Sequence, residues 1–241
     1  MQTNLHVGLS AQLSLLRRLE TIANNVANAS TAGFRAEEVK FETLLSRTSL
    51  DPVAFASAGN TYLSQRSGEI VRTDNQFDLA VEGNGWLAIQ TPAGLAYTRD
   101  GRMRMTDTGE LQTLNGHAIL DVGSAPVRLD PNAGPPAIAR DGTITQNNRQ
   151  IGAIGLFTID AKANLKRFEN SGVIPDRPAQ PALDFTRVGM QQGYIERANV
   201  NPVMEMTKLI MVSRTLEAVT ASLKESETSL QEAIRTLGAT S

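Results

Sequence analysis

Residues 202–237 read PVMEMTKLIMVSRTLEAVTASLKESETSLQEAIRTL, and leucine recurs at every seventh position of this stretch. A sustained seven-residue apolar repeat is typical of a helix that packs along one face, as in a coiled coil. Ser226 replaces the second apolar position of its heptad, so we expect weaker packing in the outer half of the helix. The repeating leucines are Leu209, Leu216, Leu223, Leu230 and Leu237.

The opposite end of the chain also predicts a helix. Its apolar residues recur at spacings of three and four, which places them on one helix face. The pattern ends at residues 28–33, NASTAG, and both Asn and Gly commonly end helices because they tolerate positive φ. The residues of this stripe are Leu5, Leu9, Leu13, Leu16, Leu19, Ile22, Ala23 and Val26.

Neither terminal helix can bury its apolar stripe alone. The two helices could pack on each other within one chain, or they could also pack on neighbouring subunits. Periodicity alone favours the intrachain arrangement and leaves the intersubunit arrangement open.

Residues 68–184 show a different sequence pattern. Short β-prone runs such as 77–81 (FDLAV) and 86–89 (WLAI) alternate with turn pairs such as Asp100-Gly101 and Asp141-Gly142. Turn signals at this spacing predict an antiparallel sheet structure. We therefore expect an α+β, mainly β fold, in which discontinuous N- and C-terminal coiled-coil helices enclose a central antiparallel β-domain. The expected parts are a terminal helical domain (1–35 with 198–241), a connecting segment (36–67 with 185–197) and the β-domain (68–184).

Composition excludes several classes of protein. The 241 residues carry a net charge of −2, which argues against a general nucleic-acid binder. Cysteine is absent, so disulfides, thiolate metal sites and cysteine nucleophiles are excluded. No apolar run approaches the roughly 20 residues that span a membrane, so we expect no membrane insertion. Residues 1–20 lack the features of a secretory signal, so we expect no cleaved signal peptide.

No stretch of the sequence predicts catalysis. Gly83-Asn84-Gly85 begins a loose dinucleotide-binding pattern, but a strand rather than a helix is expected to follow it, so we predict a turn. Residues 97–101, YTRDG, predict a hairpin turn with an exposed Arg99–Asp100 ion pair of little energetic value. Trp86, the only tryptophan, is expected to anchor the core of the β-domain. We predict no catalytic residue, no metal site and no cofactor.

Residues 19–35, LETIANNVANASTAGFR, closely resemble the N-terminal signature of the bacterial flagellar rod and hook axial proteins. Residues 194–206, YIERANVNPVMEM, resemble the start of the C-terminal helix in that family. The runs at 77–86 and 97–101 are similar to its β-domain, and residues 141–144 and 152–157 continue that similarity. Within the family, the chain looks most like the F-type proteins of the proximal rod.

The resemblance implies a structural subunit, not an enzyme. Its terminal helices would form the inner layer of a helical tube that transmits torque, with residues near Phe34 and Val200 meeting. Expected partners are other rod proteins, copies of itself and the flagellar type III export apparatus. The expected location is the periplasmic rod of the basal body, reached by export without a cleavable signal peptide.

The predicted assembly interface combines both ends of the chain. Asn24, Asn25 and Asn28 would supply amide hydrogen bonds where the first helix ends, and Gly33 would permit the turn that follows. Phe34 would fix that turn by local packing, although docking into a neighbouring chain is the alternative. The residues of the packing seam are Leu9, Leu13, Leu16, Ile22, Val26, Leu209, Leu216, Leu223 and Leu230.

Three rival functions remain. A distal-rod paralogue would share the fold. A cell-wall hydrolase would need a catalytic carboxylate in a cleft, and the sequence nominates none. A coiled-coil adaptor or chaperone unrelated to motility would leave the Asn-rich N-terminal signature unexplained.

Overall fold

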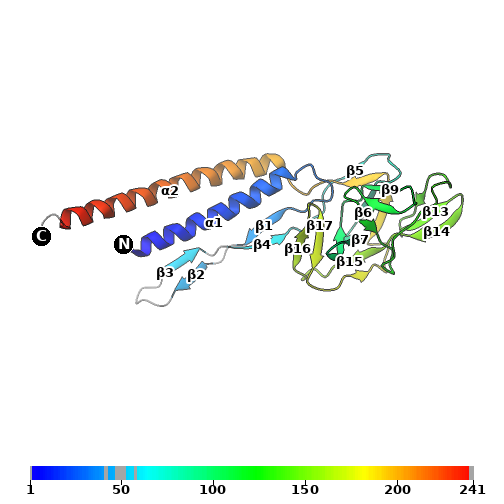
Figure 1. Cartoon of the computed structure of the whole chain (residues 1–241), viewed down its shortest axis with the longest axis horizontal. Helices are drawn as coiled ribbons and strands as arrows, with labels where there is room; N and C mark the ends of the chain where they lie inside the picture. Colours follow the sequence, from blue (N-terminus) through cyan, green and yellow to red (C-terminus); the bar gives the residue numbers. More distant parts are fainter. Residues whose placement is uncertain (1, 41–42, 47–52, 57–58, 239–241) are drawn as a thin grey trace. The chain divides into compact units, whose positions relative to one another are not determined.

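The computed structural model describes residues 2–40, 43–46, 53–56 and 59–238 (Figure 1). They divide into two compact units. The first, here the helical unit, comprises Met1–Ala27, Glu37–Tyr62 and Asn201–Ser241. The second, here the β body, comprises Asn28–Ala36 and Leu63–Val200.

Two helices dominate the helical unit: α1 (Gln2–Ala27) and α2 (Pro202–Gly238). They lie side by side and run in opposite directions, as Figure 1 shows. The backbone N–H of Met204 donates to the side-chain oxygen of Asn201 over 3.1 Å, which caps the start of α2. Pro202 occupies the first helical position, where its missing N–H costs no hydrogen bond.

Short strands complete the helical unit. Strand β1 (Glu37–Lys40) pairs with β4 (Asn60–Leu63), and β2 (Thr43–Ser46) pairs antiparallel with β3 (Val53–Ala56). From the sequence we expected only a connecting segment here. Runs of four residues are too short for their alternation to stand out from a loop.

The β body is built on a nine-stranded sheet in the order β16-β17-β8-β7-β11-β10-β9, with β15 pairing both β7 and β18. Every strand pairing recorded for this sheet is antiparallel, as predicted. Its strands are β7 (Gly85–Thr91), β8 (Gly94–Thr98), β9 (Met103–Met105), β10 (Leu111–Thr113), β11 (Ala118–Ile119), β15 (Leu156–Thr158), β16 (Leu165–Phe168), β17 (Gly172–Pro175) and β18 (Gln180–Pro181).

Smaller antiparallel sheets surround this one. One has the order β12-β13-β14, and two further pairs join β19 to β6 and β20 to β5. The strands are β5 (Ile70–Arg72), β6 (Leu79–Glu82), β12 (Ala137–Ile138), β13 (Thr143–Gln146), β14 (Arg149–Ala153), β19 (Gly189–Gln192) and β20 (Tyr194–Glu196).

The core of the β body is mostly aliphatic. Leu79, Leu87, Ile119 and Ile144 are completely buried in one cluster. A second cluster contains Trp86, with the rings of Tyr97 and Phe157 in edge-to-face contact at a centroid distance of 5.6 Å. Trp86 is thus a core residue, as the sequence predicted.

Gly83-Asn84-Gly85 forms the turn between β6 and β7, with Gly83 at φ +71°. A strand therefore follows the glycines, as expected, and no helix N-terminus is present there to receive a pyrophosphate.

The prediction of two terminal helices and an antiparallel β body is confirmed. Residues 28–36 group with the β body, and so do 185–197, which contain β19 and β20. Among the described residues, no helix is long and apolar enough to cross a bilayer.

Candidate functional site in the helical ends and their junctions

The heptad face of α2 packs on α1. A Cβ built on Gly8 would lie only 2.3 Å from Cδ2 of Leu223, so the glycine makes room for that leucine. Leu209 and Leu216 share the helix face of Leu223 and are half-buried, and Val212 on the same face is buried. Part of the predicted seam is therefore covered within the chain. The Leu230 side chain lies outside the described residues.

Three leucines of the predicted seam are uncovered in the single chain. Leu9, Leu13 and Leu16 are 50%, 56% and 38% exposed. Their spacing places them on one face of α1. By contrast, Ile22 is buried and Val26 is half-buried. We call the three exposed leucines the α1 leucine face.

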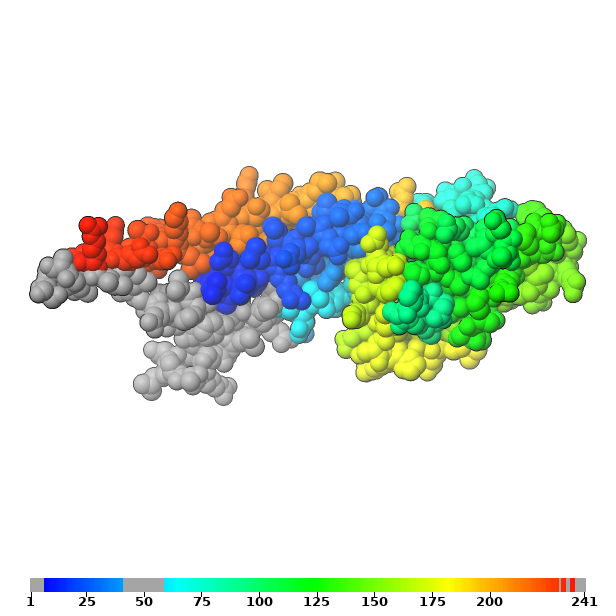
Figure 2. Space-filling view, in the orientation of Figure 1, coloured from blue at the N-terminus to red at the C-terminus, as the bar shows by residue number. Residues whose placement is uncertain are grey.

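The first turns of α2 carry a second exposed apolar surface, which the sequence analysis missed. Its residues are 52–72% exposed, and Val203 is the most exposed of them. Figure 2 shows much of α1 (blue) and α2 (orange) uncovered on the visible face of the helical unit. The many apolar residues in the stretch 203–211, VMEMTKLIM, could have indicated this surface. We call this set the α2 apolar face: Val203, Met204, Met206, Ile210 and Met211.

Asn25 ties the end of α1 to β1 and α2. Its side-chain amide donates to the carbonyl of Glu37 over 2.9 Å, and its side-chain oxygen accepts from the Glu37 N–H over 2.9 Å. The same amide lies 3.4 Å from Oε2 of Glu205, which is buried on the first turn of α2. Asn25 thus makes the kind of amide bonds the sequence predicted, whereas the role of Glu205 was missed.

Asn28 also bonds at the end of α1, where the Thr31 hydroxyl donates to its side-chain oxygen over 3.2 Å. Asn24, the third predicted asparagine, is half-buried in the last turn of α1.

The turn at Gly33 and Phe34 lies inside the β body. Gly33 has φ +67°, and a Cβ there would be 2.2 Å from the backbone nitrogen of Asp100. Phe34 is completely buried, with the guanidinium of Arg167 4.3 Å from its ring centroid. The Asn199 N–H donates to the Phe34 carbonyl over 3.2 Å, so the chain near Phe34 does meet the chain near Val200.

A buried ion cluster follows this turn. Nη2 of Arg35 is 3.0 Å from Oε1 of Glu196, and Nε of Arg99 is 3.4 Å from Oε2 of the same carboxylate. All three side chains are at most 2% exposed. Burial lowers the pKa of Arg99 to about 10, with Glu196 opposing that shift and Arg35 adding to it. Burial also lowers the pKa of Arg35.

The expected exposed Arg99–Asp100 pair is therefore wrong. Asp100 instead pairs with Arg102 over 2.7 Å, and Arg99 turns inward to Glu196. No local pattern could reveal this, because Glu196 is distant in sequence and only the fold brings it close.

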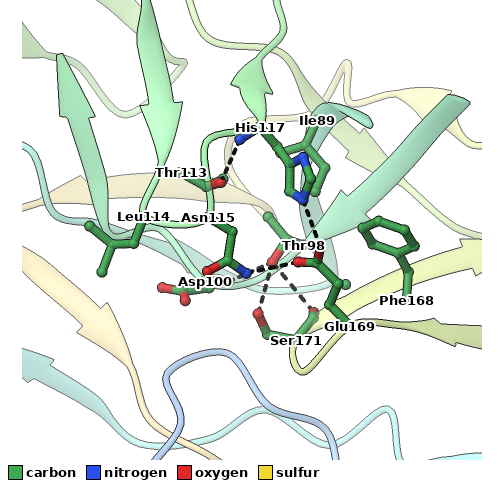
Figure 3. Close-up of a pocket in the computed structure, with 11 residues that line it drawn as sticks. Ile89, Thr98, Asp100, Thr113, Leu114, Asn115, His117, Phe168, Glu169 and Ser171 are labelled. Carbon is green, nitrogen blue, oxygen red and sulfur yellow. Dashed lines mark hydrogen bonds and ion pairs between the residues drawn. The ribbon is translucent and has the colours of Figure 1, made fainter. Parts of the chain in front are cut away.

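A small polar pocket of about 20 Å³ lies between the loops that carry Asn115 and Glu169 (Figure 3). Asn115 and His117 both point at the Glu169 carboxylate, with distances of 2.8 Å and 2.9 Å. Burial raises the pKa of Glu169, but hydrogen bonds from His117 and Asn115 outweigh that effect and lower it. These side chains satisfy one another, so the cluster is a clamp between two loops.

Among the described residues, no group of three or more His, Asp or Glu side chains is arranged to hold a metal ion.

Comparison with family models matches three separate parts of the chain. Three family models match: "Flagella basal body rod protein" over residues 5–35, "Flagellar hook protein FlgE/F/G D1 domain" over 80–146 and "Flagellar basal body rod FlgEFG protein C-terminal" over 191–236.

Individual relatives match end to end. The chain is 51% identical to the flagellar basal-body rod protein FlgF of Mesorhizobium japonicum, over 100% of both chains. It is 45% identical to FlgF of Rhizobium meliloti, over 99% of each chain. It is 34% identical to FlgF of Caulobacter vibrioides, again over 99% of each.

Proposed function

The chain belongs to the FlgF family of flagellar basal-body rod proteins, and we propose that it joins its neighbours in the rod through the exposed apolar faces of α1 and α2. As a member of that family it is a structural subunit of the bacterial flagellar rod, located in the basal body. Its partners include other rod proteins. Family membership does not favour an adaptor unrelated to motility.

The observation that carries the proposal is the exposure of the α1 leucine face. Fully burying a leucine contributes about 1.5–3 kcal/mol, so covering half-exposed leucines contributes on the order of 1 kcal/mol each. Soluble proteins rarely leave large apolar residues gathered on one surface unless a partner covers them. Leu9, Leu13 and Leu16 together supply such a surface.

The α2 apolar face would be the complementary surface. Contacts between two different faces of identical or related subunits are head-to-tail, and such contacts build an open helical assembly when the rotation between subunits does not close a ring. In this arrangement the terminal helices form a coiled-coil inner layer of the proximal rod, and packed helices transmit torque. The β body then occupies the outer side of the tube.

Export precedes assembly in this proposal. The chain would leave the cytoplasm through the flagellar type III export apparatus and take its place in the periplasmic part of the rod. The terminal helices would gain their final order on docking, in the manner of coupled folding and binding.

An aspartate placed in the α1 leucine face tests the proposal. Leu13→Asp should abolish motility and remove the chain from purified hook–basal bodies, because a carboxylate cannot be buried there without a partner. Arg18→Asp introduces the same residue at an exposed position off the leucine face and should leave assembly intact. Normal motility of cells carrying Leu13→Asp would refute the docking role of this face.

A further inference from the structure

Charge is unbalanced in the interior of the β body. The cluster at Glu196 holds two guanidinium groups, of Arg35 and Arg99, against one carboxylate. Buried charges are ordinarily paired because removing an ion from water is costly. Two guanidinium groups share one carboxylate, so one positive charge of this cluster has no counter-charge of its own among the described residues.

The remaining bonds of the two arginines do not supply that charge. Arg99 donates to the carbonyls of Val81 and Gly83 over 2.8 Å and 2.5 Å and to the Ser67 hydroxyl over 3.2 Å, and all three acceptors are neutral. Arg35 donates to the carbonyl of Arg66. Its Nε is buried without a hydrogen bond to any described atom. Nε of Arg99 and Oε2 of Glu196 are likewise buried without a hydrogen bond, so the cluster keeps a spare positive charge and unused donors.

A cavity of about 40 Å³ opens directly on these arginines. Roughly 10–15 Å³ holds one water molecule, so the space is large enough for a carboxylate group. Trp86 forms one wall, and the guanidinium carbons of Arg35 and Arg99 lie 5.7 Å and 5.6 Å from its ring centroid. Amide side chains and aliphatic side chains complete the lining: Gln65, Asn84, Ile159, Ala161 and Leu165.

The residues that line this cavity differ in charge from those that line the two pockets compared with it below. The cavity beside Trp86 includes two arginines and no carboxylate. The pocket of Figure 3 includes Asp100 and Glu169, and the groove beside β18 includes Asp184. Only the lining at Trp86 combines excess positive charge, amide donors and an aromatic wall among these three.

We propose that this cavity is a binding site for a carboxylate group. A planar carboxylate matches the fork of donors that a guanidinium presents, and charge-assisted hydrogen bonds of this kind are the strong ones. The carboxylate would accept from the guanidinium groups of Arg35 and Arg99, which line the cavity, and offset the positive charge left over by Glu196. Aliphatic side chains at Ile159 and Leu165 would pack on the carbon atoms that carry the group.

The carboxylate could come from a small free anion or from an acidic side chain of a neighbouring chain. Titration of the full-length protein with sodium acetate, against sodium chloride at equal ionic strength, separates the two sources. Trp86 is the only tryptophan, so its emission reports on the cavity directly. Saturation below about 1 mM acetate would indicate a free anion. Saturation only at tens of millimolar would indicate a side chain, because a docked partner holds its carboxylate at the site and binding becomes intramolecular, without the need for high intrinsic affinity.

In both cases acetate should raise the unfolding midpoint in a saturable way, because a ligand of the folded state stabilises it. Chloride should not reproduce this shift. Equal emission and equal midpoints in acetate and chloride up to 200 mM would overturn the proposal.

Substitutions at the cavity and away from it show whether the acetate response arises there. Ala161→Glu places a carboxylate at the cavity, so it should unfold at a higher temperature than Ala161→Gln and lose the acetate response. Ala93→Glu adds the same charge at an exposed turn away from the cavity and should keep the response. An acetate response that persists unchanged in Ala161→Glu would overturn the assignment to this cavity.

Discussion

At the scale of single residues, the junction after α1 depends on side chains that local sequence identifies only in part. Asn25 and Gly33 behave as their types suggest, because an amide satisfies orphan backbone groups and glycine permits positive φ. Arg35 and Arg99 do not, because their shared partner Glu196 is far along the chain. Sequence indicated where the turn lies and missed the buried ion cluster beneath it.

Substitution at Gly33 should be severe. Gly33→Ala forces a side chain into positive φ, which costs about 1–3 kcal/mol, and drives its Cβ into the backbone of Asp100. Gly116 also has a positive φ, +87°, but a Cβ there would meet only the end of the Arg104 side chain at 3.7 Å, so Gly116→Ala carries the conformational cost alone. Urea unfolding followed by Trp86 fluorescence should show the larger loss for Gly33→Ala. Equal losses for the two variants would mean that the close approach to Asp100 is unimportant.

The Glu169 clamp should make stability depend on acidity. The folded-state pKa of Glu169 lies below its ordinary value of 4.5. The clamp therefore contributes its full stabilisation above about pH 4.5 and loses it as pH falls through the folded pKa. Glu169→Gln should flatten the acid limb of the midpoint-versus-pH curve relative to the unaltered chain. Superimposable curves would show that the clamp is energetically neutral.

At the scale of elements, periodicity predicted both helices and turn pairs predicted the antiparallel body. The four-residue strands β1 to β4 escaped notice because so few residues show no reliable alternation. The leucines of the heptad repeat and those of the N-terminal stripe differ in how far the single chain buries them. Leu223 packs on Gly8, whereas Leu13 is exposed. A stripe tells which residues share a face, and it does not tell which surface covers them.

Because Leu223 is packed on α1 and Leu13 is exposed, shortening each of them to alanine should change the stability of the chain by different amounts. Leu223→Ala should cost roughly 1–2.5 kcal/mol, about half the 2–5 kcal/mol of a fully buried leucine, because Leu223 is half-buried. Leu13→Ala should change stability by less than about 0.5 kcal/mol, as exposed substitutions do. Helical circular dichroism during thermal unfolding measures both. A destabilisation by Leu13→Ala equal to that by Leu223→Ala would place Leu13 in the intrachain contact.

At the scale of the whole molecule, the two units differ in whether their apolar side chains are buried within the chain. The β body buries its own aliphatic core and closes the Phe34 turn within itself. The helical unit instead keeps leucines and methionines on its surface. A rod subunit needs such a surface, because assembly is driven by apolar area that only a neighbour covers.

The absence of cysteine allows the most direct test of this division. A single cysteine at Leu13→Cys should react readily with a maleimide in the soluble chain and at least tenfold more slowly in isolated basal bodies. Val122→Cys, at an exposed position of the β body, reports whether the reagent reaches the particle. Labelling of Leu13→Cys at the same rate in the soluble chain and in the intact rod would contradict the claim that neighbouring subunits cover the α1 leucine face.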